Sequence, residues 1–292
     1  MDVLKTNDFN LLNKFKKNYH SQYGEDGIIE YLLNILSNIP KICCEFGAMD
    51  GKKLSNTYRL FNEKGFNAIL LERDESYFTK LQKEFKNNEK VKMFNTEVNP
   101  SGPFSLDNIF KKNNLPMELG VLSIDIDSFD YWVFKQIEFI RSAIVIVEFN
   151  NSIPADIDYN DDENEVALRC SAKALERIGN EKGYKVVACT TTNVIFVHQN
   201  YIDKTVNEKL PNLPIEAMFD YEGQRKNNTY PIFPVYSQMI SSYPIFSTKP
   251  SKDIKLFIYI RQIFKSLIIN SERFKKPSKQ NCKNIKKSGM WI

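Results

Sequence analysis

The 292-residue chain is 42% hydrophobic and 13% aromatic, which is enough to bury one substantial core. No apolar run of about 18 residues occurs, so hydropathy excludes a membrane-spanning helix. The net charge of +4 is uneven: residues 249–292 hold twelve Lys and Arg against two acids, or +10, which leaves −6 for residues 1–248. This mildly acidic body argues against nucleic-acid binding as the main function.

Strand and helix patterns alternate along the chain after a polar lead-in. Strands are predicted at residues 42–46, 68–72, 91–98, 119–126 and 143–149, and helices at 56–64, 75–86, 105–112, 129–139 and 163–182. These strands are nearly continuous apolar runs, which is typical of a parallel sheet buried on both faces. Two last strands, at 184–189 and 194–197, are joined by so short a turn that they must be antiparallel. The predicted fold class is a Rossmann-like α/β fold with a mostly parallel seven-stranded sheet ending in an antiparallel hairpin.

The C-terminal part of the chain has a different composition. Residues 206–250 alternate prolines with aromatics and are predicted to form a loop region or lid. Residues 251–292 are predicted to form a basic amphipathic helix and tail, which either docks on its own domain, contacts a membrane surface or is solvated. The predicted organisation is therefore a lead-in at 1–20, a central domain at 21–205, the loop region and the tail.

The expected compartment is the cytoplasm. The N-terminus lacks a basic segment followed by an apolar one, and the five cysteines lack metal-ligand spacing. Cys43 and Cys44 lie in a predicted strand, where cysteine acts as a small hydrophobe. The basic tail leaves open a peripheral contact with the inner face of the membrane, and the sequence also leaves open an oligomer.

The first chemical signal lies at residues 42–51 (ICCEFGAMDG), where an apolar run ends in Glu45 and a loop from Gly47 to Gly51. The next predicted strand ends in Glu72, 21 residues after Gly51. A strand, a glycine turn, a helix and an acid-tipped strand predict a nucleoside site, in which the second acid holds the ribose hydroxyls. Glu45 favours adenosine with a cationic tail, which indicates S-adenosylmethionine. Alternatively, the glycines only make a tight turn and Glu72 caps the next helix. Ser55 is expected to cap the helix at 56–64, and Gly65 is expected to end it.

The second signal is a group of acids at the end of the fourth predicted strand, the edge where open α/β sheets bind ligands. If the strand continues, Asp125 and Asp127 share one of its faces. Three interpretations remain open for Asp127. It takes a proton from an acceptor hydroxyl while Asp125 faces a sulfonium. It binds a divalent ion such as Mg²⁺ with Asp130 or Asp125 and with Glu148 or Asn150. Or it caps the following helix.

Taken in order, these segments resemble the FkbM-like class I S-adenosylmethionine-dependent methyltransferases. The matching segments are residues 21–26 (SQYGED), 45–51 (EFGAMDG), 55–57 (SNT), 122–127 (LSIDID) and 147–150 (VEFN). The resemblance covers roughly residues 20–200 and implies the methyltransferase variant of the Rossmann-like fold. It also implies an O-methyltransferase acting on a sugar, nucleotide-sugar or phosphate-type acceptor in bacterial surface polysaccharide (capsule or lipopolysaccharide) biosynthesis. The expected partner is thus a small-molecule or glycan-precursor acceptor.

The resemblance also implies roles for individual residues. The expected cofactor-binding residues are Gln22, Glu45, Gly47, Asp50, Gly51, Asn56, Glu72, Thr96 and Asp125. Among them, Glu45, Gly47 and Gly51 border the methionine part of the cofactor. Glu72 binds the ribose of the cofactor, and Thr96 lies at the edge of its adenine. The expected metal ligands are Asp127, Asp130 and Glu148, and His20 is an alternative catalytic base to Asp127 or a structural histidine.

Two other functions remain as alternative hypotheses. An NAD(P)-dependent oxidoreductase is disfavoured because the glycine loop lacks a first closely spaced pair and because the sheet ends in a hairpin. A methyltransferase-fold protein that binds the cofactor without turnover, as a partner or scaffold, would carry the same cofactor residues.

Overall fold

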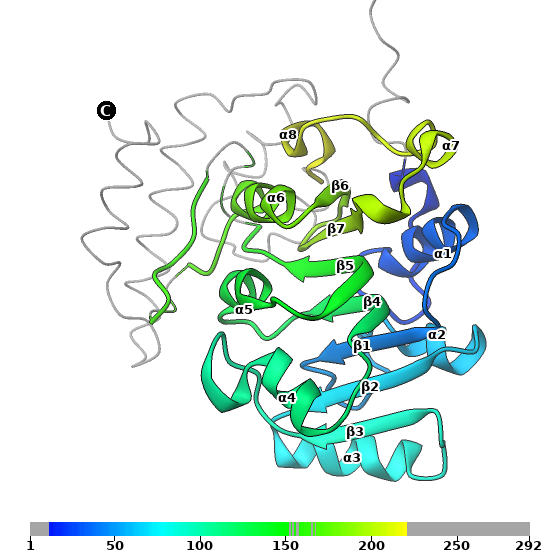
Figure 1. Cartoon of the computed structure of the whole chain (residues 1–292), viewed down its shortest axis with the longest axis vertical. Helices are drawn as coiled ribbons and strands as arrows, with labels where there is room; N and C mark the ends of the chain where they lie inside the picture. Colours follow the sequence, from blue (N-terminus) through cyan, green and yellow to red (C-terminus); the bar gives the residue numbers. More distant parts are fainter. Residues whose placement is uncertain are drawn as a thin grey trace, which may run out of the picture.

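The computed structural model describes residues 12–151, 153, 155, 158–164, 166 and 168–220. Seven strands form one sheet in the order β3-β2-β1-β4-β5-β7-β6 (Figure 1). The strands are β1 (Ile42–Phe46), β2 (Asn67–Glu72), β3 (Val91–Asn95), β4 (Glu118–Ile124), β5 (Arg141–Glu148), β6 (Tyr184–Cys189) and β7 (Asn193–His198). Strands β1 to β5 pair in parallel, whereas β7 runs antiparallel to both β5 and β6. The predicted fold class is confirmed.

Helices cover both faces of the sheet, as its continuous apolar strands require. The α-helices are α1 (Glu25–Ile35), α2 (Tyr58–Glu63), α3 (Glu75–Phe85), α4 (Leu106–Lys112), α5 (Asp130–Gln136), α6 (Ala172–Glu181), α7 (Lys204–Asn207) and α8 (Ile215–Met218), with short 3-10 helices at Asn13–Phe15, Gly102–Phe104 and Gln199–Tyr201. One core cluster joins the sheet to α4, α5, α6 and α8, and a second joins it to α1, α2, α3 and α7. Figure 1 shows α4, α5 and α6 following one another along the sheet.

The two adjacent cysteines of β1 show how one strand serves both cores. Cys43 belongs to the cluster under α1 to α3, and Cys44 belongs to the cluster under α4 to α6. Both thiols are fully buried and free, as expected of small hydrophobes in a strand whose side chains alternate between faces.

The largest error in the sequence-based boundaries concerns α6. A helix was expected from residue 163, but α6 begins at Ala172, where the Ser171 hydroxyl accepts a hydrogen bond from the Ala174 amide and so caps the first turn. The expected helix at 56–64 begins at Tyr58 because Ser55 bonds the amides of Thr57 and Tyr58 from outside the helix. Gly65 ends this helix as predicted, with a φ of +76°.

The chain after β7 continues to pack on the core. Residues 206–220, expected to begin a separate loop region, bury Val206, Leu210, Ile215 and Met218. A salt bridge of 2.7 Å joins Asp220 to Lys16 near the other end of the described chain. The remainder of the predicted lid and the basic tail lie outside the described residues. Within the described part of the chain, no helix has the length and apolar character to cross a membrane.

Candidate active site

The candidate site lies where the order of the strands reverses. The chain passes from β1 outward to β2 and β3, and then returns to place β4 on the other side of β1. In open α/β sheets the carboxyl ends of the strands at such a switch point form the usual ligand site. The predicted site residues after β1, β2, β4 and β5 therefore meet at one edge of the sheet.

Glu45 at the end of β1 is held by the loop that precedes α2. Its buried carboxylate accepts hydrogen bonds from the Ser55 hydroxyl at 2.5 Å, the Thr57 hydroxyl at 2.7 Å and the Asn56 amide at 2.8 Å. Burial is the main influence on this carboxyl and raises its pKa, while these donors oppose the shift. Glu45 therefore fixes the 55–57 loop against β1.

The two glycines of the loop after β1 face different neighbours. A Cβ on Gly47 would lie 2.0 Å from the carbonyl oxygen of Asp125, so this glycine lets the loop after β1 pack directly on the backbone after β4. A Cβ on Gly51 would lie 2.6 Å from side-chain atoms of Leu81 and Phe85 in α3. Both have a φ near +75°, which glycine adopts without strain. The tight turn and close packing expected of both glycines are present, and Gly51 packs on α3.

Glu72 at the end of β2 bonds two loops at once. One carboxylate oxygen accepts a hydrogen bond from the Met49 amide at 2.7 Å, and the other accepts one from the Asp74 amide at 2.7 Å. The helix cap that was the alternative role for Glu72 is made by Asp74, which accepts the amides of Ser76 and Tyr77. Each Glu72 oxygen retains acceptor capacity beyond its one backbone bond.

The other expected cofactor residues lie around these strand ends. The Asn56 side chain donates to the Ser123 hydroxyl of β4 at 3.1 Å, and Asp50 accepts the amides of Lys52 and Lys53. The Thr96 amide donates to the Glu72 carbonyl at 3.1 Å, directly after β3.

Gln22 and His20 lie in the segment before α1. The exposed Gln22 side chain donates to the Tyr23 hydroxyl at 3.0 Å. The His20 ring packs edge-on against Tyr58, with 4.4 Å between the ring centroids, and its amide donates to Asp26. These contacts place His20 on the aromatic side chain at the start of α2.

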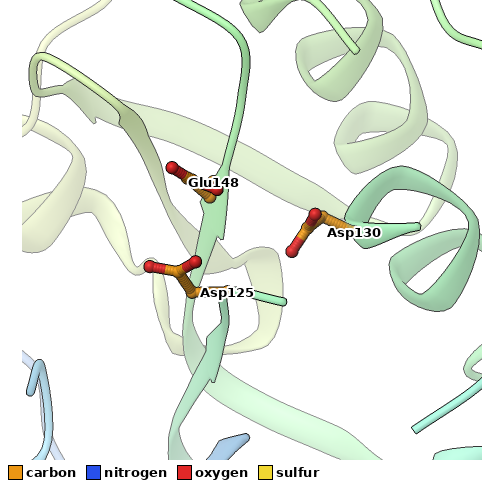
Figure 2. Close-up of side chains that lie close together, drawn as sticks. All are labelled: Asp125, Asp130 and Glu148. Carbon is orange, nitrogen blue, oxygen red and sulfur yellow. The ribbon is translucent and has the colours of Figure 1, made fainter. Parts of the chain in front are cut away.

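Three carboxyl groups converge after β4 and β5. Asp125, Asp130 and Glu148 each place an oxygen within 4.8 Å of the others, and Figure 2 shows the three side chains pointing toward one another. These three residues are called the acidic cluster below. Asp125 comes from the loop after β4, Asp130 from the first turn of α5 and Glu148 from the end of β5. Of the expected metal ligands, the structure brings Asp130 and Glu148 together, with Asp125 rather than Asp127 as the third carboxyl group.

Close packing of like charges changes the acid–base behaviour of the acidic cluster. Burial, with the charges of Asp130 and Asp127, raises the pKa of Asp125 to about 7. Burial also raises the pKa of Asp130 and, more strongly, that of Glu148. For Glu148 the charge of Asp125 adds to the effect of burial, while the charge of Arg169 opposes it.

Asp127 does not share a strand face with Asp125. Strand β4 ends at Ile124, and Asp127 has a φ of +57°, so its exposed side chain leaves the strand pattern. It does not cap α5 either: Asp130 accepts the amides of Ile126 and Ser128 and so shapes this loop. The chain turns at residue 127 because Asp130 bonds the two flanking amides.

Arg169 is a charged residue of this site that sequence reasoning missed. Its Nη1 atom is hydrogen-bonded to Glu148 Oε2 and lies 3.0 Å from Asp127 Oδ1. It was overlooked because residues 163–182 were predicted as one helix, on which Arg169 would belong to a solvated face. The usable signal is Ser171, a good N-cap residue two positions later, which makes Arg169 part of a loop.

Neither a family model nor a curated protein matches the sequence. Among solved structures, M. capricolum TrmK with bound S-adenosyl-homocysteine is 10% identical, with a TM-score of 0.41 over 83% of this chain and 97% of that one. The glycopeptide N-methyltransferase MtfA with S-adenosyl-L-methionine is 12% identical, with a TM-score of 0.38 over 63% and 96%. The citrinin polyketide synthase CMeT domain is 13% identical, with a TM-score of 0.39 over 60% of this chain. The chain spans about half the length of that structure, at 51%, and of the CurJ carbon methyltransferase, at 52%. The fold assignment rests on the strand order and directions given above.

Proposed function

We propose that this chain is an S-adenosylmethionine-dependent methyltransferase. The observation that carries the proposal is the placement of Glu72, the loop from Gly47 to Gly51 and Asp125 around the switch point between β1 and β4. An acid at the second strand end, next to a glycine loop at the first, fits the ribose of a nucleoside. The antiparallel β7 favours this class over an oxidoreductase.

Glu72 is proposed to hold the ribose hydroxyls. Each of its two oxygens accepts one backbone amide, from Met49 or Asp74, so acceptor positions are left for two hydroxyl donors. Because those two amides also fix the carboxylate, Glu72 is oriented before any ligand binds. Glu45 is proposed to act through the loop it holds, since three donors of that loop already occupy its oxygens.

The acidic cluster is proposed to accept the proton of the acceptor group. The cofactor would supply an activated methyl group, so the chain has only to align the acceptor oxygen, exclude water and remove one proton. A pKa near 7 suits Asp125 to that task, because a general base works best when its pKa lies near the working pH. Asp125 would take the hydroxyl proton as the acceptor oxygen takes the methyl group that the cofactor supplies.

The acceptor is proposed to be a hydroxyl group of a sugar or nucleotide-linked sugar used in surface polysaccharide synthesis. The sugar class rests on the resemblance to the FkbM-like enzymes. The acidic cluster and Asp127 favour a neutral hydroxyl over a phosphate at the reacting position, because a second anion would be repelled there.

Calorimetric titration with S-adenosylhomocysteine, and with NADH as the competing nucleotide, tests the cofactor. We expect binding of the former alone. Glu72→Ala should weaken that binding by about tenfold to a hundredfold, because it removes charge-assisted hydrogen bonds. Glu72→Gln keeps the side-chain size and one acceptor oxygen, so its loss should be smaller. Binding of NADH alone would overturn the proposal in favour of an oxidoreductase.

Turnover separates an enzyme from a scaffold. Methyl transfer to a panel of nucleotide sugars should fall by about a hundredfold or more in Asp125→Asn, while S-adenosylhomocysteine binding by this variant changes little. A wild-type chain that binds S-adenosylhomocysteine and methylates none of the panel would support the scaffold alternative.

A further inference from the structure

We propose that Arg169 is the built-in cation of the acidic cluster, and that this site works with a guanidinium where a divalent ion was expected. The inference deepens the proposed function, on which its catalytic meaning rests, and it corrects the metal-binding interpretation of the sequence. Arg169 is proposed as a positioning residue that keeps Glu148 and Asp127 in place beside Asp125.

The position of the guanidinium carries the proposal. Nη1 of Arg169 is hydrogen-bonded to Glu148 Oε2, inside the acidic cluster, and also lies 3.0 Å from Asp127 Oδ1 at its outer side. One nitrogen thus serves two carboxylates that come from different strand ends. An ammonium or a metal ion placed between the same oxygens would have to displace this nitrogen, because like charges repel at such distances.

The carboxyls do not fit a divalent ion as they stand. Each oxygen of Asp130 already accepts one backbone amide, from Ile126 at 2.8 Å and Ser128 at 3.1 Å, so the orientation of this carboxylate is fixed by its own loop. Oε2 of Glu148 already accepts the hydrogen bond from Arg169 Nη1. A divalent ion would have to replace this donor, and Mg²⁺ in addition demands near-ideal octahedral geometry.

The loop that carries Arg169 is built around a buried carboxylate. Oδ2 of Asp161 accepts the amides of Leu168 at 2.8 Å and Arg169 at 2.5 Å, and the Asp161 amide donates to the Arg169 carbonyl at 2.8 Å. Asp161 is only 3% exposed, and its carbonyl accepts the indole N–H of Trp132 in α5 at 2.9 Å. The loop is therefore tied to the same helix that supplies Asp130.

The backbone of Arg169 is strained, and the strain has a local cause. Its φ is +62°, in the left-handed region that non-glycine residues rarely adopt. The paired bonds to Asp161 hold the residue there. The residue in this strained conformation is the one whose side chain bonds Glu148.

Titration of the full chain with Mn²⁺, followed by electron paramagnetic resonance, tests the proposal without any need for turnover. We expect no stoichiometric Mn²⁺ site in the wild-type chain. Arg169→Met keeps the length of the side chain and removes the charge, so the freed carboxylates should bind Mn²⁺ at least about tenfold more tightly than the wild type does. Arg169→Lys restores a cation and should again bind no Mn²⁺.

Each other result also decides the question. A wild-type chain that binds one Mn²⁺, and loses it in Asp130→Asn, would overturn the proposal. So would an Arg169→Met variant that folds and gains no affinity. If Arg169→Met does not fold, a folded Arg169→Lys variant without Mn²⁺ binding supports the proposal, and one that binds Mn²⁺ overturns it. Titration with S-adenosylhomocysteine reports separately on the proposed function, so the two can fail independently.

Discussion

Two regions of the same sheet edge hold buried or partly buried carboxylates by different means. After β1 and β2, Glu45 and Glu72 are held by amides and hydroxyls of the loops beside them. After β4 and β5, Asp130 also accepts amides of its own loop, but Glu148 is held by the distant Arg169. The first region uses neutral donors, and the second adds a counter-charge.

The difference predicts how each region responds to change. A carboxylate that accepts several neutral donors is a structural anchor, because removing it leaves those donors unsatisfied. A carboxyl beside like charges is a titrating group, whose charge depends on pH and on a single cation. The region after β1 and β2 should therefore respond mainly in stability and binding, and the acidic cluster mainly in its pH dependence.

Glu45→Ala should have the largest effect on stability. It leaves two hydroxyls and one amide of the 55–57 loop without their acceptor in a buried place, which should cost about 3–5 kcal/mol of unfolding free energy. Urea unfolding followed by circular dichroism measures this cost. Glu45→Gln is the matched control, because its amide oxygen still accepts the Asn56 N–H, and it should cost about 1–2 kcal/mol. Equal costs in both variants would show that charge, not donor satisfaction, holds this loop.

Gly47→Ala should have the next largest effect, about 2–4 kcal/mol of unfolding free energy. The new Cβ would lie 2.0 Å from the Asp125 carbonyl oxygen, so the two loops must move apart, and the φ of +75° adds backbone strain. Gly65→Ala is the control, since its φ is +76° but nothing lies within 4 Å of the added Cβ. It should cost only about 1 kcal/mol, the strain alone. If the two variants cost the same in urea unfolding, the loops after β1 and β4 are not in close contact.

The sequence predicts the region after β1 and β2 more completely than it predicts the acidic cluster. Glu45, Gly47 and Glu72 follow directly from strand ends, because parallel strands place successive carboxyl ends on one edge of the sheet. Their exact bonding partners, such as Ser55 for Glu45, are close in the chain and belong to the same motif. Local pattern and fold class therefore predict this region well.

The acidic cluster was predicted only in part, for a physical reason. Asp125, Asp130 and Glu148 follow from strand and helix ends, but which of them converge depends on the turn at Asp127 and its φ of +57°. Arg169 reaches Glu148 across 21 positions of chain through a loop that Asp161 shapes. No periodic pattern encodes such a loop, so the loop was included in the helix predicted for residues 163–182.

Asp125→Asn should flatten the dependence of stability on pH. The pKa of Asp125 is about 7 in the folded chain and about 4 in the unfolded one, so the folded state holds the extra proton between these values. The contribution of Asp125 to stability is fully present below about pH 4. It falls by up to about 1.4 kcal/mol per pH unit as the pH rises to about 7, and above that pH it stays low. Asp125→Asn lacks this decline. The unfolding free energy of the variant minus that of the wild type should therefore be more positive at pH 7 than at pH 4.

Asp74→Asn provides a control of opposite sign for that measurement. Hydrogen bonds from Ser76 and Tyr77 lower the pKa of Asp74, so its contribution to stability is present at neutral pH and is lost as pH falls through the folded pKa. Thermal unfolding at a series of pH values should therefore separate the two variants by the direction of change. A wild-type minus Asp125→Asn difference that does not vary between pH 4 and 7 would contradict a raised pKa.

Asp127→Asn should have the smallest effect on stability and turnover. It tests whether the role of the exposed Asp127 differs from that of the acidic cluster. The Asp127 side chain is 84% exposed and makes one 3.0 Å contact with Arg169, and exposed ion pairs contribute about 0–1 kcal/mol. Asparagine also tolerates the positive φ, so unfolding free energy should change by less than about 0.5 kcal/mol. Turnover should fall by less than about tenfold if Asp125 accepts the proton. A loss of about a hundredfold or more with unchanged S-adenosylhomocysteine binding would instead assign the proton to Asp127. Arg169 would then orient the base itself, because its Nη1 already contacts Asp127.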